Sequence, residues 1–266
     1  MKLIIQIPCF NEAETLEVTL NDLPKHIDGI DEIEYLIIDD GSHDNTAEVA
    51  KKWGVHYVVR FRRNKGLAKG FMAGLDACLK NGADIIVNTD ADNQYCGADI
   101  ETLVRPILDK KAHIVIGERP IDDTEHFTPL KKKLQHFGSW VVRKASKTTI
   151  PDAPSGFRAY SREAAMRINV INDYTYTLET IVQSGREKMA VMSVPIRTNP
   201  ELRESRLFHS MCKLMTILKK PASRKNHTNV LMHIQGYFRN QLNSRQRGEL
   251  RDVILHYRDG LRHCRR

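Results

Sequence analysis

Short apolar runs alternate with segments of helical periodicity along about the first 90 residues of the chain. The runs are continuous, as in strands buried on both faces of a sheet. They cover residues 2–7, 35–38 and 56–59, and a fourth starts at Ile85 and leads into Asp90. Helices are predicted between them: one with a stripe of leucines from Leu16 to Leu23, one from Asp44 to Gly54 and one from Asn64 to Gly82. This alternation predicts an α/β fold, with a mostly parallel sheet flanked by helices.

Polar residues follow three of these strands directly. They are Asn11 and Glu12, Asp39 and Asp40, and Asp90 and Asp92. Parallel strands end at a common edge of the sheet, and ligands bind outside that edge. Carboxylates gathered there would repel one another unless a cation or hydrogen-bond donors lay among them. The pattern therefore favours a metal site.

The segment from Asp90 to Gln94 is the candidate for that site. In a strand that leaves a sheet, residues i and i+2 point the same way, so Asp90 and Asp92 are expected to converge. Gln94 would add a third oxygen, and Mg²⁺ prefers oxygen ligands. The alternative is an ordinary turn, because Asp is common in turns.

The usual glycine-rich phosphate loops are missing from the sequence. No G-x-G-x-x-G follows the first strand, and no G-x-x-x-x-G-K-[ST] occurs anywhere. Dinucleotide-binding and P-loop proteins are therefore disfavoured. An acid pair without a glycine loop indicates that phosphates are held through a metal, which is a nucleotide-sugar arrangement.

Seven motifs carry a family resemblance. They are Pro8-x-x-Asn11-Glu12, Asp39-Asp40-Gly41-Ser42-x-Asp44-x-Thr46, Asn64-x-Gly66, Thr89-Asp90-Ala91-Asp92-x-Gln94, Gly117-Glu118-Arg119, the segment from Pro151 to Arg158, and the segment from Asn199 to Leu207. Over about residues 1–212 they resemble the family-2 glycosyltransferases with a GT-A fold. The branch they resemble contains the dolichyl- and polyprenyl-phosphate sugar synthases, although Glu118 departs from that branch's Gly-Ser-Arg segment.

The resemblance implies a role for each matching residue. The nucleoside pocket would be lined by Pro8, Asn11, Glu12, Asp39 and Asp40, and the donor site would also include Lys65, Gly66 and Ala91. Asp90, Asp92 and Gln94 would hold Mg²⁺ or Mn²⁺ against the donor diphosphate and so neutralise the departing group. Cationic donors for phosphates would be Arg119, Arg158, Arg203 and Arg206. A surface ion pair is an equal alternative for Arg206.

Asp152, with Asp92 and Arg158, is the predicted catalytic set. The family inverts the anomeric centre, so the resemblance implies a single displacement without an enzyme nucleophile. If the acceptor is a sugar hydroxyl, Asp152 is the candidate base. If the acceptor is a lipid phosphate, the nucleophile is already anionic, and Asp152 would instead position a group or a cation.

Charge is unevenly distributed along the 266 residues. The net charge is +8, yet from Arg197 onward there are 16 Lys and Arg against 5 Asp and Glu. We predict a catalytic domain over residues 1–212 and a basic helical tail over 213–266. A basic tail suits an anionic partner such as lipid headgroups or nucleic acid, but a solvated helical face is the favoured interpretation.

Residues 127–150 place apolar side chains at helical spacing beside Lys131-Lys132-Lys133 and Arg143-Lys144. Such a helix suits an anionic membrane surface, and packing on the core is an equal alternative. No apolar run approaches the roughly 18 residues of a membrane span, and no signal peptide precedes the first strand. Five scattered cysteines fit a reducing compartment. A cytoplasmic protein, or one peripheral at the inner membrane face, is expected.

Residues 221–260 resemble part of the YbgA-type helical domain of unknown function. Asn243-x-x-Gln246 reads as a capping box between two predicted helices. A hairpin this small needs a surface to pack on, either the first domain or a second copy of the chain, which makes a homo-oligomer plausible.

These observations predict an enzyme that moves a sugar from a UDP- or GDP-sugar to a polyprenyl phosphate or, second, to a saccharide. The alternative from another class is a non-catalytic protein that binds membranes or nucleic acid through its basic tail. A dead domain is expected to lose acids at Asp90, Asp92 or Asp152, and all three are present, so nucleic acid is a disfavoured partner. A sugar nucleotidyltransferase would need a glycine- and arginine-rich loop after the first strand, which residues 8–12 are not.

Overall fold

The computed structural model of the chain describes residues 1–121, 139–140, 142–143, 146–171 and 175–200. Its contacts divide the chain into two units, Met1–Arg203 and Glu204–Arg266. Arg203, Arg206 and the predicted tail lie outside the described residues, as does most of the segment 127–150. The domain boundary after residue 212, the amphipathic helix and the hairpin therefore stay predictions.

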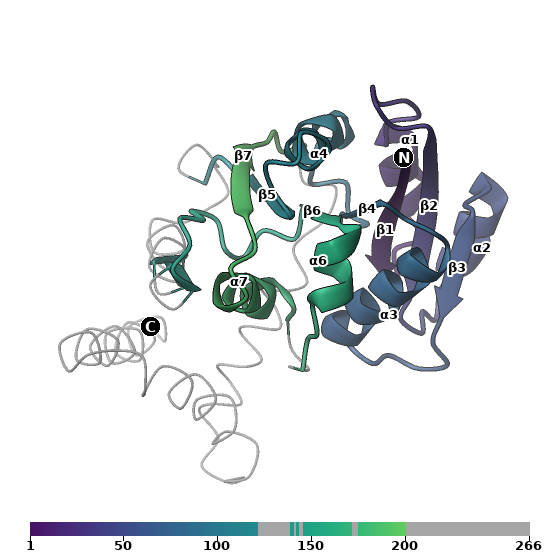
Figure 1. Cartoon of the computed structure of the whole chain (residues 1–266). Helices are drawn as coiled ribbons and strands as arrows, with labels where there is room; N and C mark the ends of the chain where they lie inside the picture. Colours follow the sequence, from purple (N-terminus) through teal and green to yellow (C-terminus); the bar gives the residue numbers. More distant parts are fainter. Residues whose placement is uncertain (122–138, 141, 144–145, 172–174, 201–266) are drawn as a thin grey trace, which may run out of the picture. The chain divides into compact units, whose positions relative to one another are not determined.

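One sheet of seven described strands forms the centre of the first unit, in the order β3-β2-β1-β4-β6-β5-β7 (Figure 1). The strands are β1 (Lys2–Cys9), β2 (Glu32–Asp39), β3 (Tyr57–Arg60), β4 (Ile85–Asn88), β5 (Ile114–Glu118), β6 (Arg158–Ser161) and β7 (Val191–Pro195). The first four are parallel to one another, as their order in the sequence predicts. The predicted α/β fold with a mostly parallel sheet is confirmed.

Helices cover both faces of this sheet. They are α1 (Leu16–Asp22), α2 (Thr46–Trp53), α3 (Leu67–Lys80), α4 (Ile100–Leu108), α6 (Arg162–Arg167) and α7 (Thr177–Arg186), with a 3-10 turn η1 (Gly97–Asp99) before α4. Helix α2 ends as predicted at Gly54, whose φ of 93° lies in the left-handed region that glycine adopts without strain. Among the described residues, none of the helices has the length and hydrophobicity needed to cross a membrane.

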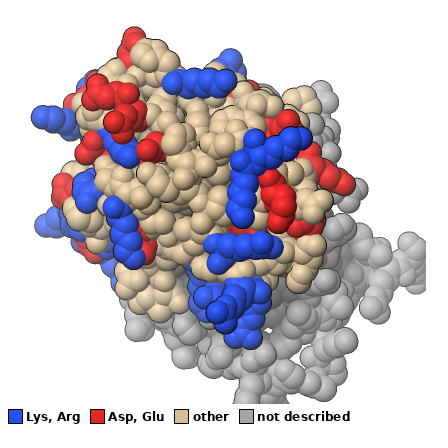
Figure 2. All heavy atoms as spheres, turned by 90° about the vertical axis from the view of Figure 1, so that its right-hand side faces the viewer, with Lys and Arg blue, Asp and Glu red and all other residues tan. Residues whose placement is uncertain are grey.

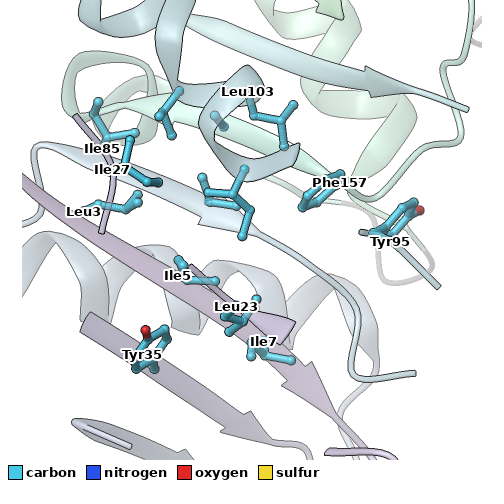
Figure 3. Packing of buried hydrophobic residues seen from close by; sticks show 14 of the residues in the cluster. Leu3, Ile5, Ile7, Leu23, Ile27, Tyr35, Ile85, Tyr95, Leu103 and Phe157 are labelled. Carbon is cyan, nitrogen blue, oxygen red and sulfur yellow. The ribbon is translucent and has the colours of Figure 1, made fainter. Parts of the chain in front are cut away.

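Two hydrophobic cores result, one on each face of the sheet. On one face Leu3, Ile5 and Ile7 of β1 pack with residues of α1, α2 and α4 (Figure 3). On the other face Ile4 packs with residues of α3, α6 and α7. Alternate residues of β1 thus enter different cores, and burial of each such side chain contributes about 1.5–3 kcal/mol. This two-sided burial explains why the strand is continuously apolar.

Strand β6 is the exception to the parallel order and is decisive for the site. It lies between β4 and β5 and is antiparallel to both. Asn88, the last residue of β4, pairs with Arg158, the first residue of β6. The segment that leads into β6 therefore lies beside the segment that leaves β4, although about 70 residues separate them in sequence.

Charge on the described unit is mixed. Residues 1–196 carry 28 Asp and Glu against 25 Lys and Arg. The face shown in Figure 2 carries both basic (blue) and acidic (red) side chains in several places. The net basic charge of the chain thus comes from residues 197–266.

Candidate active site

The polar ends of the strands meet at one edge of the sheet, as predicted. Cys9 pairs with Asp39, so β1 and β2 end together, and β4 ends on the same side of the sheet at Asn88, opposite Gln6 of β1. Strand β5 ends at this edge, and β6 starts from it because β6 runs the other way. The edge thus gathers the segments 10–12, 40–44, 89–95, 119–121 and 152–157.

The segments after β1 and β2 are tied to each other. Asn11, with a φ of 55°, donates its backbone N–H to Ser42 Oγ at 2.9 Å and accepts at its side-chain oxygen from the His43 N–H at 2.8 Å. The Glu12 N–H donates to Thr46 Oγ1 at 2.9 Å. These bonds fix the loop that carries Asn11 and Glu12 against the loop that follows Asp40.

Asp39 is fully buried and has one partly satisfied oxygen. Its Oδ1 accepts from the Ser42 N–H at 2.8 Å. Its Oδ2 forms an ion pair with Nε of Arg60 at 3.0 Å but accepts no hydrogen bond. A buried carboxylate oxygen without a hydrogen bond is unusual in folded proteins and marks a position where a ligand donor would be stabilising.

Asp40 holds the start of α3. Its two carboxylate oxygens accept from the backbone N–H groups of Lys65 at 2.6 Å and Gly66 at 2.9 Å. The next residue, Gly41, has a φ of 73°, and a Cβ on it would lie 2.5 Å from the carbonyl carbon of Arg63. The predicted donor-site residues Asp40, Lys65 and Gly66 are therefore in contact with one another. The carboxylate of Asp40 stabilises the loop before α3 by accepting its backbone hydrogen bonds.

The turn that carries Asp90 and Asp92 follows β4 and is not part of it. Strand β4 ends at Asn88. We expected the two carboxylates to converge because side chains alternate along a strand, and this reason is wrong because Asp90 and Asp92 lie beyond the strand. Thr19 of α1 donates to the Ala91 carbonyl at 2.9 Å, and Ala91 is buried. Asp92 Oδ1 accepts from the Gln94 N–H at 3.4 Å.

The predicted metal ligands are two carboxylates and one amide. In the described part of the chain no group of three or more His, Cys, Asp and Glu residues is placed to hold a metal ion. The set of Asp90, Asp92 and Gln94 combines two carboxylates with an amide, and it stays a prediction. Gln94 also accepts at its backbone carbonyl from the Asn199 N–H at 2.9 Å, which brings Asn199 beside this turn.

Asp152 and Arg119 form a buried pair at the same edge. Nε of Arg119 donates to Oδ2 of Asp152 at 2.7 Å and Nη2 donates to Oδ1 at 2.9 Å, while Asp152 is 1% exposed. Burial alone would lower the pKa of Arg119, but Tyr95, Asp152 and Asp90 outweigh it and leave that pKa raised. Arg119 is therefore a permanent cation beside the Asp90 turn.

Arg158 requires a correction. It is fully buried, and it donates to the carbonyl oxygens of Ser155, Ala153 and Thr177 and to Thr180 Oγ1 at 2.7–2.8 Å. Four of its five N–H donors are thus used by the protein. Arg158 holds the segment before β6 to the start of α7, so four of its donors are not available to a phosphate in this structure.

Sequence reasoning missed three residues that touch this edge. Asn88, Tyr95 and Tyr176 all hydrogen-bond to the backbone of Gly156, in the segment between Asp152 and β6. Asn88 offered a signal, since it is the polar end of an otherwise apolar buried strand. Tyr176 offered none, because its approach depends on the packing of α7.

Comparison with known proteins agrees with this architecture. Residues 4–168 match the family described as Glycosyl transferase family 2. Residues 206–265 match DUF1722, a family of proteins of unknown function, which fits the helical domain expected there.

Two relatives act on lipid phosphates according to their names. The UDP-N-acetylglucosamine–dolichyl-phosphate N-acetylglucosaminyltransferase of Methanococcus voltae is 29% identical over 217 residues, covering 72% of this chain and 83% of that protein. The undecaprenyl-phosphate mannosyltransferase of Micrococcus luteus is 26% identical over 219 residues, covering 78% of this chain and 88% of that protein.

A solved structure shares the fold. Glucosyl-3-phosphoglycerate synthase from Mycobacterium tuberculosis, in complex with Mn²⁺, UDP and phosphoglyceric acid, matches with a TM-score of 0.62 at 18% identity, covering 84% of this chain and 80% of that one. The chain therefore belongs to glycosyl transferase family 2, as its motifs predict, and it is a glycosyltransferase with the GT-A fold.

Proposed function

We propose that this glycosyltransferase moves a sugar from a nucleoside-diphosphate sugar to a polyprenyl phosphate, with Mg²⁺ or Mn²⁺ bound at the donor. The observation that carries the proposal is the meeting of the Asp90 turn with the buried pair of Arg119 and Asp152 at one sheet edge. One segment supplies oxygen ligands and the other supplies a fixed cation.

The donor end of the site is suited to a nucleoside diphosphate. Asp39 has a buried oxygen that lacks a hydrogen bond, which suits a nucleobase N–H donor. Asp90, Asp92 and Gln94 offer oxygen atoms only, the donor set that Mg²⁺ and Mn²⁺ prefer. The metal, when bound there, would neutralise the diphosphate that leaves. The glucosyl-3-phosphoglycerate synthase complex holds Mn²⁺ together with UDP, which supports this assignment by analogy of fold.

The state of Asp152 favours a phosphate acceptor over a sugar hydroxyl. Both of its carboxylate oxygens accept from Arg119, so the group is poorly placed to take a proton from an alcohol. A lipid phosphate is already anionic near neutral pH and needs no base. In this assignment Arg119 attracts the acceptor phosphate and Asp152 orients Arg119, and the two relatives named for lipid phosphates support it.

The acceptor also bears on where the enzyme works. A polyprenyl phosphate resides in a membrane, so we infer a peripheral protein that visits the membrane surface from the cytoplasmic side. The predicted amphipathic segment 127–150 would serve this contact, and Arg203 and Arg206 would remain donors to phosphates. Self-association of the chain stays a prediction.

The test begins with a thermal-shift panel of UDP-, GDP- and dTDP-sugars with and without Mn²⁺. One nucleotide is expected to raise the Tm only when Mn²⁺ is present. Asp92→Ala is expected to abolish that shift without changing the Tm of the free protein. Asp76→Ala is the matched control, because Asp76 is an exposed carboxylate of α3 paired with Lys80.

Transfer is then measured with the donor so identified. Undecaprenyl phosphate in detergent is expected to accept the sugar, and simple saccharides are not. Metal-dependent stabilisation that persists in Asp92→Ala would refute the metal assignment. Transfer to saccharides alone would refute the acceptor.

A further inference from the structure

The peptide group of Gly156 is held on both sides. Its N–H donates to the hydroxyl of Tyr95 at 3.2 Å. Its carbonyl accepts from Nδ2 of Asn88 at 3.0 Å and from the hydroxyl of Tyr176 at 3.2 Å. Nδ2 of Asn88 also donates to the Tyr176 hydroxyl at 2.8 Å. We name Asn88, Tyr95 and Tyr176 the Gly156 clamp.

Each member of the Gly156 clamp is fixed from behind. Asn88 accepts at Oδ1 from Nε2 of Gln6 at 2.9 Å, and both residues are fully buried. The ring of Tyr176 stacks on Phe71 with centroids 3.9 Å apart and planes 3° apart. The ring of Tyr95 stacks on Phe157 at 4.9 Å and 9°. The Gly156 clamp is therefore part of the packed interior, and it fixes Gly156 relative to the sheet.

The Asp90 carboxylate lies against Gly156. A Cβ on residue 156 would come 3.3 Å from each carboxylate oxygen of Asp90 and 3.2 Å from the Tyr176 hydroxyl. The φ of Gly156 is not in the left-handed region, so its backbone does not require glycine. The carboxylate and the hydroxyl therefore leave little space for a side chain here.

From this geometry we infer that Asn88 and Tyr176 are positioning residues for the transfer reaction. They hold the Gly156 peptide group in place, and the contact with Gly156 orients the Asp90 carboxylate. The inference deepens the proposed function and rests on it. Gly156 also lies between Asp152 and β6, so the Gly156 clamp fixes the Arg119–Asp152 pair relative to the Asp90 turn. None of these groups needs to touch the reacting atoms.

Two variants test the clamp by direct binding of Mn²⁺. Tyr176→Phe removes one hydroxyl and keeps the stacked ring, and Gly156→Ala places a methyl group against Asp90. Binding is measured by electron paramagnetic resonance, as the loss of the signal of free Mn²⁺ during titration. UDP or GDP is present, whichever stabilises the wild-type protein. Outer-sphere partners of metal ligands typically contribute 10–100-fold to affinity, so each variant is expected to weaken Mn²⁺ binding by about 10-fold or more.

The matched control is Tyr35→Phe. The Tyr35 hydroxyl is also held by a carbonyl, that of Pro24 at 3.1 Å, in a part of the core away from the Gly156 clamp. This variant is expected to retain wild-type Mn²⁺ affinity even if its Tm falls. With saturating Mn²⁺, Tyr176→Phe is expected to recover much of its kcat, while its KM for the acceptor stays near the wild-type value.

The outcomes distinguish a failure of the positioning role from a failure of the proposed function. Wild-type protein that binds Mn²⁺ with nucleotide, with both variants binding equally well, would overturn the positioning role and leave the proposed function standing. Wild-type protein that binds no Mn²⁺ with either nucleotide would overturn the metal-dependent proposal and this inference with it. If Tyr176→Phe does not fold, Gly156→Ala alone decides, because its methyl group meets Asp90 directly.

Discussion

Arg119 and Asp152 meet through two parallel hydrogen bonds, 2.7 and 2.9 Å long, with Asp152 almost completely buried. The Arg119 backbone N–H adds a third contact to Oδ2 at 3.2 Å. A planar guanidinium and a carboxylate match in this geometry, and the pair is more specific than a single charge contact. Two segments that are 33 residues apart are thereby joined beside the Asp90 turn.

The pair is expected to show strong energetic coupling. Arg119→Ala leaves a buried carboxylate without its cation, and Asp152→Ala leaves a buried cation without its carboxylate. Removing one partner of a buried pair typically costs about 3–5 kcal/mol. The double variant is expected to lose much less than the sum of the two, as measured by urea unfolding of all four proteins. Additive losses would contradict the coupling.

Arg158 is expected to matter for stability first. Arg158→Lys cannot reproduce a set of four hydrogen bonds to Ser155, Ala153, Thr177 and Thr180. The buried acceptors left unpaired are expected to lower the free energy of unfolding by about 3 kcal/mol, at roughly 1 kcal/mol or more for each lost bond. Urea denaturation measures this loss.

Arg105→Lys provides the matched control for Arg158. Arg105 lies on α4, is partly exposed and pairs with Glu101 one turn away. Its replacement is expected to change stability by less than about 0.5 kcal/mol. An Arg158→Lys protein with normal stability but a raised KM for the donor or acceptor would restore the phosphate-binding role that the sequence suggested.

The strands and their common edge could be predicted because both depend on local patterns. Continuous apolar runs mark strands buried on two faces, and parallel order then brings Asp39 and Asp90 to the same edge. The environment of Arg158 could not be predicted in this way. It depends on the antiparallel pairing of β6 with β4, a long-range contact that places Arg158 opposite Asn88.

The role of Asp40 shows the same limit at shorter range. A carboxylate after a strand is equally compatible with a ribose contact and with a loop contact. Only the path of the chain after β3, which returns the Lys65 and Gly66 N–H groups to Asp40, decides that the loop takes both oxygens in this structure. The Gly156 clamp is also a product of tertiary packing, because its members come from β4, the segment after it and the start of α7.

The packing of α3 on the sheet predicts opposite effects for two glycines one helical turn apart. A Cβ at Gly74 would collide with the side-chain oxygen of Gln6 and lie 2.8 Å from Cδ1 of Ile38. A Cβ at Gly70 would meet only Cγ2 of Ile38, at 3.8 Å. Gly74→Ala is expected to destabilise by about 1–3 kcal/mol through overpacking.

Gly70→Ala is the control in the same helix, and it is expected to stabilise by about 0.4–1 kcal/mol because alanine loses less backbone freedom on folding. Thermal unfolding of both variants gives the comparison. Equal shifts of Tm in the same direction would mean that α3 does not approach β1 as closely at Gly74 as the structure indicates.

Acid sensitivity is expected at Asp44, which ties the loops after β1 and β2 together. Its carboxylate accepts from the backbone N–H groups of Ala13 and Thr46, each at 3.1 Å, and from the Thr46 hydroxyl. Burial by itself would raise the pKa of Asp44, but these hydrogen bonds outweigh it and lower the pKa. The unfolded chain therefore binds a proton more readily than the folded one, and stability rises with pH in this range.

The contribution of Asp44 is complete above the unfolded value of about 4 and is lost as the pH falls through the lower folded value. Asp44→Ala is expected to cost about 1–2 kcal/mol at pH 7, similar to the loss of a side chain that accepts from backbone N–H groups at a helix start. The difference in free energy of unfolding between the wild type and Asp44→Ala should narrow as the pH drops below about 4. Urea unfolding at pH 7, 5 and 3 measures this difference. For Asp76→Ala, which removes an exposed carboxylate, the free energy of unfolding should change with pH in the same way as that of the wild type. A gap at Asp44 that stays constant down to pH 3 would show that the hydrogen bonds do not depend on the charge of this carboxylate.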